Sequence, residues 1–163
     1  MRNMSIEIKN YLKIFFLFHA LFFVNALHAD SEKALAAKGF ALYEAEHYEE
    51  AIEVLTGLVN LQPEQADYHH TLAKSYGRQA EQVNWFKAMN YAKKTREHLE
   101  IAVDLKPDNV QYLDDLMDYY REAPSFLGGD KKKAETIRLR IEKLLSNDAH
   151  YYSDNAAKNN LDN

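Results

Sequence analysis

The strongest constraint on the fold is a short pattern that occurs around Pro63 and again around Pro107. The two stretches read LVNLQPEQA and AVDLKPDNV, and each has a leucine two residues before the proline and an acidic residue directly after it. Proline cannot continue a helix, because it lacks the amide hydrogen and its ring clashes with the preceding turn. Each stretch therefore predicts the end of one helix and the start of the next, and together they indicate a repeated helical unit.

The segment that leads to Pro63 has the spacing of a helical hairpin, because Gly39, Ala51 and Pro63 are evenly spaced. Small side chains at the first two positions allow two antiparallel helices to approach closely. The space between these helices is expected to be filled by Leu42, Tyr43, Ile52, Leu55 and Leu58. This arrangement resembles the tetratricopeptide repeat (TPR), a helix–turn–helix unit of about 34 residues. The resemblance covers residues 32–145 and implies an all-α solenoid of about three hairpins with one concave face.

The second unit begins near Ala66, where the residues that match the first-helix pattern are Leu72, Ala73 and Tyr76. Pro107 lies about ten residues later than a 34-residue unit would place it. We expect these extra residues to lengthen both helices rather than to form a loop. Apolar or small residues recur at alternating helical steps from Trp85 to Ala102, which supports a long helix there. Trp85 is predicted to be a core anchor of this helix rather than a ligand platform.

The third unit begins near Val110, and its second helix carries Ala134 at the close-contact position that Ala51 has in the first unit. The residues after this unit are polar and rich in asparagine. Terminal repeats usually need a polar outer face to remain soluble. The sequence therefore predicts a TPR-like domain at 30–145 and a polar C-terminal cap or tail at 146–163.

The stretch APSFLGGDKKKA joins the two helices of the third unit. We expect Pro124 to help end the first helix, Gly128 or Gly129 to supply a left-handed backbone, and Asp130 to cap the second helix. Three lysines then fall in the first helical turn, where the helix dipole disfavours cations. They are predicted to form a solvated face. The alternative is a contact with an anion or an acidic partner, made by Lys131, Lys132 and Lys133.

Residues 1–29 have the pattern of a secretory signal peptide, with basic residues, the apolar run IFFLFHALFFV and then small residues. The run is shorter than the roughly 20 residues that span a bilayer, so an uncleaved anchor is the lesser alternative. Cleavage is expected after Ala26 or Ala29, which leaves no stable membrane anchor. Residues 1–29 carry a formal charge of +2, so the remainder carries −7 of the total of −5. We predict a periplasmic or secreted protein.

Composition and motifs argue against several classes of function. The absence of cysteine excludes disulfides, thiolate metal sites and a cysteine nucleophile. The acidic remainder lacks the basic footprint that nucleic-acid binding requires. The sequence contains no HExxH, no glycine-rich phosphate loop and no GxSxG elbow. His69 and His70 would point about 100° apart on a helix, and acid pairs such as Asp114–Asp115 suit exposed helix faces. We therefore predict no enzyme, no cofactor and no metal site.

Stacked repeats form a curved surface that is lined by the first helix of each unit. The side chains expected on this surface combine aromatic, basic and acidic groups that would suit an extended peptide: Phe40, Tyr43, His70, Lys74, Arg78, Asp114, Asp118 and Arg121. Some TPR domains grip the C-terminal carboxylate of chaperones with a clamp of lysine, asparagine and arginine. The corresponding positions lack that set, so chaperone-tail binding is not expected; they are Ala36, Phe40, Thr71, Gln111 and Asp115.

The predicted function is that of an exported scaffold or adaptor that binds a protein or peptide in its concave groove without catalysis. An alternative is a small-molecule-binding accessory subunit of a periplasmic transport system. The features that favour this alternative are the apolar residues of the long second unit, Trp85, Phe86, Met89 and Tyr91. A continuous apolar cavity beside Trp85 would support it. A third interpretation is a homo-oligomer, because three repeats leave apolar end faces that a second copy could cover.

Overall fold

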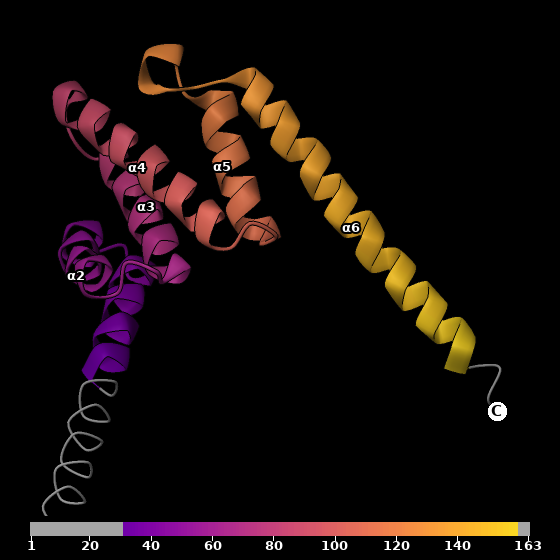
Figure 1. Cartoon of the computed structure of the whole chain (residues 1–163). Coiled ribbons are helices and arrows are strands. Elements are labelled where there is room, and N and C mark those ends of the chain that lie inside the picture. Colours follow the sequence, from indigo (N-terminus) through magenta and orange to yellow (C-terminus); the bar gives the residue numbers. More distant parts are fainter. Residues whose placement is uncertain (1–30, 160–163) are drawn as a thin grey trace, which may run out of the picture.

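The computed structural model describes the backbone of residues 31–159 and the side-chain environment of residues 31–147. The chain forms successive helical hairpins (Figure 1): a helix at residues 31–44, α2 (Tyr48–Leu61), α3 (Ala66–Glu81), α4 (Trp85–Leu105), α5 (Val110–Glu122), the 3-10 helix η1 (Ser125–Leu127) and α6 (Lys131–Asn159). The predicted all-α fold of about three hairpins is confirmed. No described helix combines the length and apolarity needed to cross a membrane. The predicted signal peptide at 1–29 lies outside the described residues.

Both prolines of the repeated pattern lie in the short linkers between hairpins, as predicted. Pro63 falls between α2 and α3, and Pro107 falls between α4 and α5. The helix that follows the second linker begins with a side-chain cap, because Asn109 Oδ1 accepts a hydrogen bond of 3.1 Å from the backbone N–H of Tyr112. Pro107 thus prevents α4 from continuing, and Asn109 caps the first turn of α5.

The first hairpin closes at the small residues that the sequence indicated. A Cβ added at Gly39 would lie 3.0 Å from a methyl group of Leu55, so the two helices approach as closely as this glycine allows. Ala51 and Leu55 are fully buried in the same contact. The hairpin is therefore held by apolar packing at the positions that carry the TPR resemblance.

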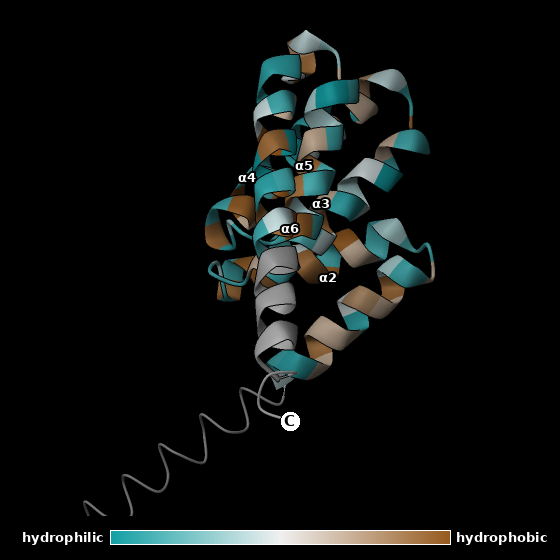
Figure 2. Ribbon diagram, turned by 90° about the vertical axis from the view of Figure 1, so that its right-hand side faces the viewer, coloured by the Kyte–Doolittle hydropathy of each residue, from teal (hydrophilic) through white to brown (hydrophobic). Residues whose placement is uncertain are grey.

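Two apolar clusters stabilise the molecule, and α3 contributes to both. Leu72 belongs to the cluster between the first hairpin and α3, whereas the adjacent Ala73 belongs to the cluster formed with α4, α5 and α6. Hydrophobic and hydrophilic residues alternate along the helices wherever Figure 2 colours them by hydropathy. This pattern buries one stripe of each helix and leaves the other in solvent.

The second hairpin is lengthened in both helices, as predicted. α3 has 16 residues and α4 has 21, compared with 14 in α2. The prediction that Trp85 anchors the core is wrong, because its side chain is 60% exposed and that of the neighbouring Phe86 is 80% exposed. Trp85 is the first residue of α4 and lies at the tip of the hairpin, where its ring contacts Phe126 of η1 at a centroid distance of 6.3 Å. No further helix covers this tip in the described part of the chain.

The turn between α5 and α6 has the predicted construction. Pro124 follows the end of α5, and Gly128 has a φ of 95°, which is the left-handed conformation that glycine adopts without strain. Asp130 Oδ1 accepts hydrogen bonds from the backbone N–H groups of Lys132 and Lys133, at 2.9 and 3.2 Å. The helix that begins there, α6, continues without a break to Asn159 and extends away from the other helices (Figure 1).

Replacing the capping residue Asn109 with alanine is expected to lower the free energy of unfolding by about 1 kcal/mol, because the amide N–H of Tyr112 loses its side-chain acceptor. Urea unfolding of the wild type and the variant measures the difference. The control is Asn90→Ala in the exposed part of α4, where alanine is expected to have little effect or to stabilise slightly. Equal destabilisation by both substitutions would contradict a capping role for Asn109.

Candidate interaction groove

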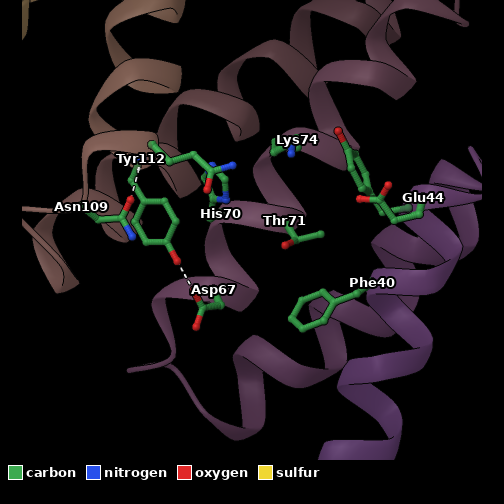
Figure 3. Close-up of a pocket in the computed structure, with 10 residues that line it drawn as sticks. Phe40, Glu44, Asp67, His70, Thr71, Lys74, Asn109 and Tyr112 are labelled. Carbon is green, nitrogen blue, oxygen red and sulfur yellow. Dashed lines mark hydrogen bonds between the residues drawn. The ribbon is translucent and has the colours of Figure 1, made fainter.

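Two neighbouring cavities lie on the face formed by the first helix of each hairpin. The first cavity has a volume of about 340 Å³ and lies between residues 31–44, α3 and α5 (Figure 3). The second has a volume of about 640 Å³ and lies between α3 and α5, over α4 and the turn after α5. Tyr43 and Lys74 line both cavities. The two therefore form one continuous surface, which we call the inner groove and define by the residues that line either cavity.

Most of the residues predicted for the concave surface lie in the inner groove. Six of the eight line it, namely Phe40, Tyr43, His70, Lys74, Arg78 and Asp118. Asp114 is exposed on α5 and lines neither cavity, and Arg121 lines a separate depression between α5 and α6. Whether any of these side chains contacts a partner stays a prediction.

The floor of the first cavity is a network of hydrogen-bonded side chains (Figure 3). His70 is 5% exposed, donates through Nε2 to Asp115 Oδ2 at 2.6 Å and stacks on the Tyr112 ring at 4.3 Å. The Tyr112 hydroxyl donates in turn to Asp67. This hydrogen bond and the Lys106 ammonium, 3.0 Å away, hold the pKa of Asp67 below its usual range, and burial opposes them. The network links α3 to α5 and fixes the floor before any ligand arrives.

The second cavity has an apolar floor. α4 contributes Ala92 and Leu99, and the turn after α5 contributes Pro124 and Leu127. Leu99 and Leu127 are themselves buried, at 3% and 8% exposure, so they form a firm surface rather than mobile side chains. The α4 residues that line this cavity, Ala92, Thr95 and Leu99, lie in the middle of the helix, away from its first residue Trp85.

The α3 rim of the groove is basic, and aromatic rings support its cations. Lys74 Nζ lies 4.8 Å from the centre of the Tyr43 ring and forms no ion pair with a described carboxylate. Arg78 donates through Nε to the Tyr48 hydroxyl at 3.3 Å and pairs with Glu81 at 2.9 Å. These contacts hold the cationic groups of Lys74 and Arg78 at the groove, and the aliphatic parts of both side chains cover aromatic surface.

The opposite rim is acidic and belongs to α5. Asp115, Asp118 and Glu122 line the second cavity at helical steps that place them on one face. Asp118 pairs with Arg121 at 2.6 Å. Burial and the neighbouring carboxylates of Asp114, Glu122 and Asp115 nevertheless raise the pKa of Asp118, against the lowering effect of Arg121. The negative charge on this rim is therefore only partly balanced by the protein itself.

Sequence reasoning found only part of this acidic rim, because it placed Asp118 on the concave surface but not Asp115 or Glu122. The pair Asp114–Asp115 suggested an exposed face, but Asp115 turns into the groove to bind His70. The available signal was the spacing of Asp115, Asp118 and Glu122, which already placed the three acids on the α5 face that carries the predicted groove residue Asp118. The apolar floor was also missed, because it comes from the second helix of a hairpin and from a turn.

The three lysines at the start of α6 lie outside the inner groove. All three are exposed, and Lys133 Nζ lies 4.9 Å from the centre of the Tyr120 ring. Two backbone N–H groups that an anion could use already donate to Asp130. Contact of Lys131, Lys132 or Lys133 with an anion or acidic partner stays a prediction. In the part of the chain that the structure describes, no group of three or more acidic or histidine side chains could hold a metal ion.

Comparisons with known proteins support the fold. No family model matches the sequence, and no curated protein matches it. Among solved structures, the chain is similar to the "MamA RS-1 ArsTM double mutant", with a TM-score of 0.58 and 24% sequence identity. The similarity covers 72% of this chain and 57% of that chain, so it reaches little more than half of that protein. MamA is a TPR protein, and the described residues share its TPR-like helical architecture.

Proposed function

We propose that the protein is a non-catalytic scaffold that binds a segment of a protein partner along the inner groove. The observation that carries this proposal is the continuity of the groove, since Tyr43 and Lys74 join the two cavities across all three hairpins. A groove of this kind suits an extended chain better than a compact ligand, because it offers successive subsites along one line.

The construction of the groove supports binding without rearrangement. Its walls are helices whose inner sides are fully buried, such as α3 with Leu72 and Ala73 at 0% exposure. The hydrogen bond from His70 to Asp115 also fixes the spacing between α3 and α5. A surface that is already ordered loses little conformational entropy when a partner binds, so more of the contact energy appears as affinity.

Export to the periplasm or the cell exterior is part of the same proposal. It rests on residues 1–29 of the sequence, with their basic start, short apolar run and small-residue exit. The partner would then be a protein of the cell envelope or its surroundings. Detection of a mature form that begins after Ala26 or Ala29, by mass spectrometry of the envelope fraction, tests this part.

Filling the second cavity is expected to abolish partner binding. Ala92→Phe adds a ring to the cavity floor, whereas Lys93→Phe adds the same ring to the exposed side of α4. After crosslinking in native cells and purification under denaturing conditions, one defined protein should accompany the wild type and Lys93→Phe. It should be at least about tenfold reduced with Ala92→Phe, because the segment can no longer enter the cavity. Equal recovery with both variants would move the site elsewhere.

A small-molecule role in a periplasmic transport system is a second candidate, because about 640 Å³ lies in the range of small-ligand sites. The cavity lies along α4 from Ala92 onward, away from the exposed Trp85 that the sequence had suggested for it. Extraction of the natively purified protein, followed by mass spectrometry, distinguishes the two. A stoichiometric small molecule that is lost in Ala92→Phe would favour the transport role.

A further inference from the structure

We infer that the segment bound in the inner groove is cationic and apolar. An apolar side chain would enter the second cavity, and a neighbouring lysine or arginine would lie against the acidic rim of α5. This inference rests on the proposed function and adds the chemistry of the partner.

The lining of the inner groove carries more acidic than basic side chains. It contains six carboxylates, Glu44, Asp67, Glu81, Asp115, Asp118 and Glu122, but only two permanent cations, Lys74 and Arg78. Arg78 is already paired with Glu81. An approaching segment therefore meets a net negative surface, which accelerates and orients association with a positive partner and disfavours a negative one.

The acidic side chains are distributed unevenly in the groove. The acids of the second cavity gather on α5, where Asp115, Asp118 and Glu122 follow one another along the rim. Within the described residues, Asp115 accepts a hydrogen bond from His70, and Arg121 is the cation that pairs with both Asp118 and Glu122. One guanidinium thus serves two carboxylates, with Asp114 close by as a further negative charge. A cation supplied by a ligand would relieve this repulsion.

The apolar floor of the second cavity lies between the two charged rims. Leu99 and Leu127 form its packed base, at 3% and 8% exposure, and Ala92 and Pro124 add further hydrocarbon to its lining. A volume of about 640 Å³ has room for more than one aliphatic or aromatic side chain. A polar or acidic side chain there would lose its hydration without gaining a partner.

Lys74 sets the direction of the segment. Its ammonium lies on the α3 side, opposite the acidic rim, and forms no ion pair with a described carboxylate. A peptide whose base faces α5 can place a backbone carbonyl near Lys74 without repulsion. The two rims of the groove therefore favour different groups of the bound segment: the α5 rim favours a basic side chain, and the α3 rim favours a main-chain carbonyl oxygen.

The test selects peptides from a phage-displayed library of random dodecapeptides on the purified full-length protein. Enriched sequences should carry lysine or arginine next to leucine, isoleucine or phenylalanine. Synthetic versions should bind Asp118→Asn/Glu122→Gln about tenfold more weakly than wild type, as expected when the acidic rim loses one partly buried charge at Asp118 and one exposed charge at Glu122. The matched control is Glu53→Gln/Glu97→Gln, which neutralises two exposed acids outside the groove and should change affinity less than about twofold. Circular dichroism confirms that each variant is folded.

The outcomes separate this inference from the proposed function. Enrichment of acidic or uncharged peptides that still require an open cavity, as judged by loss of binding to Ala92→Phe, overturns the inference and leaves the scaffold function standing. Basic peptides that bind equally well to Asp118→Asn/Glu122→Gln also overturn it. If no peptide is enriched, or if Ala92→Phe binds as wild type does, the groove function fails together with the inference.

Discussion

Gly129→Ala is expected to destabilise the protein by about 2–3 kcal/mol, through overpacking of the turn between α5 and α6. A Cβ at this position would lie 1.7 Å from the carbonyl oxygen of Ala123, which is a backbone atom that cannot rotate away. The turn is held closely there, because Gly129 N–H donates to Pro124 O at 3.1 Å and Asp130 N–H donates to Tyr120 O at 2.8 Å. Chemical denaturation followed by far-ultraviolet circular dichroism measures the loss.

The matched control for this prediction is Gly57→Ala, within α2. A Cβ at Gly57 meets nothing within 4 Å, so alanine adds no clash and removes the flexibility that glycine gives the unfolded chain. We expect this variant to be more stable than the wild type by roughly 0.5–1 kcal/mol. Opposite signs for the two glycines support the close approach at residue 129, whereas destabilisation of similar size in both would contradict it.

Acidification from pH 6.5 to about 4 is expected to destabilise the folded protein through a pair of histidines on α3 and α4. His69 Nδ1 and His98 Nδ1 lie 2.9 Å apart, and His69 Nε2 donates to the carbonyl of Pro63 at 3.0 Å. Burial, followed by the neighbouring His69 and Lys94, lowers the pKa of His98 to about 4, and burial lowers the pKa of His69.

The sign follows from proton uptake. Between pH 6.5 and 4 the unfolded chain has bound a proton at His98 and the folded chain has not, so stability falls as the pH falls through this window. A difference of this size between the folded and unfolded pKa values of His98 corresponds to roughly 3 kcal/mol of stability. Because the side chain is only half-buried and solvent screens its charge, we expect a loss of about 2 kcal/mol. Unfolding free energies measured at intervals across this range give the slope.

His98→Asn tests the assignment, because the asparagine amide can still donate to His69 but does not titrate. The slope of stability against pH in this window should fall to half of the wild-type value or less, whatever the variant does to stability at neutral pH. The control is His47→Asn, because the His47 side chain is exposed beside Glu50; this variant should keep the wild-type slope. A slope that is unchanged in His98→Asn would assign the acid sensitivity to carboxylates instead.

The parts of the fold that depend on local rules could be predicted from the sequence. The linkers at Pro63 and Pro107, the close contact at Gly39 and the cap at Asp130 each follow from the chemistry of one or two residues. The length of α4 also followed from counting residues between the prolines. Such features require no knowledge of where distant segments lie.

The parts that failed depend on which surfaces meet. Trp85 has a side chain typical of a core, but it lies exposed at a hairpin tip, where its ring contacts that of Phe126. Asp115 has a side chain typical of a surface, but its hydrogen bond to His70 spans two hairpins. The groove residues on the first helices followed from the repeat register, whereas the floor at Leu99 and Leu127 required the packing of the turn over α4.

The position of α3 between the two apolar clusters has a consequence for cooperativity. Neighbouring residues of this helix, Leu72 and Ala73, pack into opposite clusters, so the melting of either cluster removes packing from a helix that the other cluster also uses. Repeat arrays can unfold from their ends, one unit at a time, and a shared middle helix opposes this because it couples the unfolding of the two clusters. A ligand that contacts α3 alone would therefore raise the melting temperature of the whole domain, in proportion to the logarithm of its concentration above Kd.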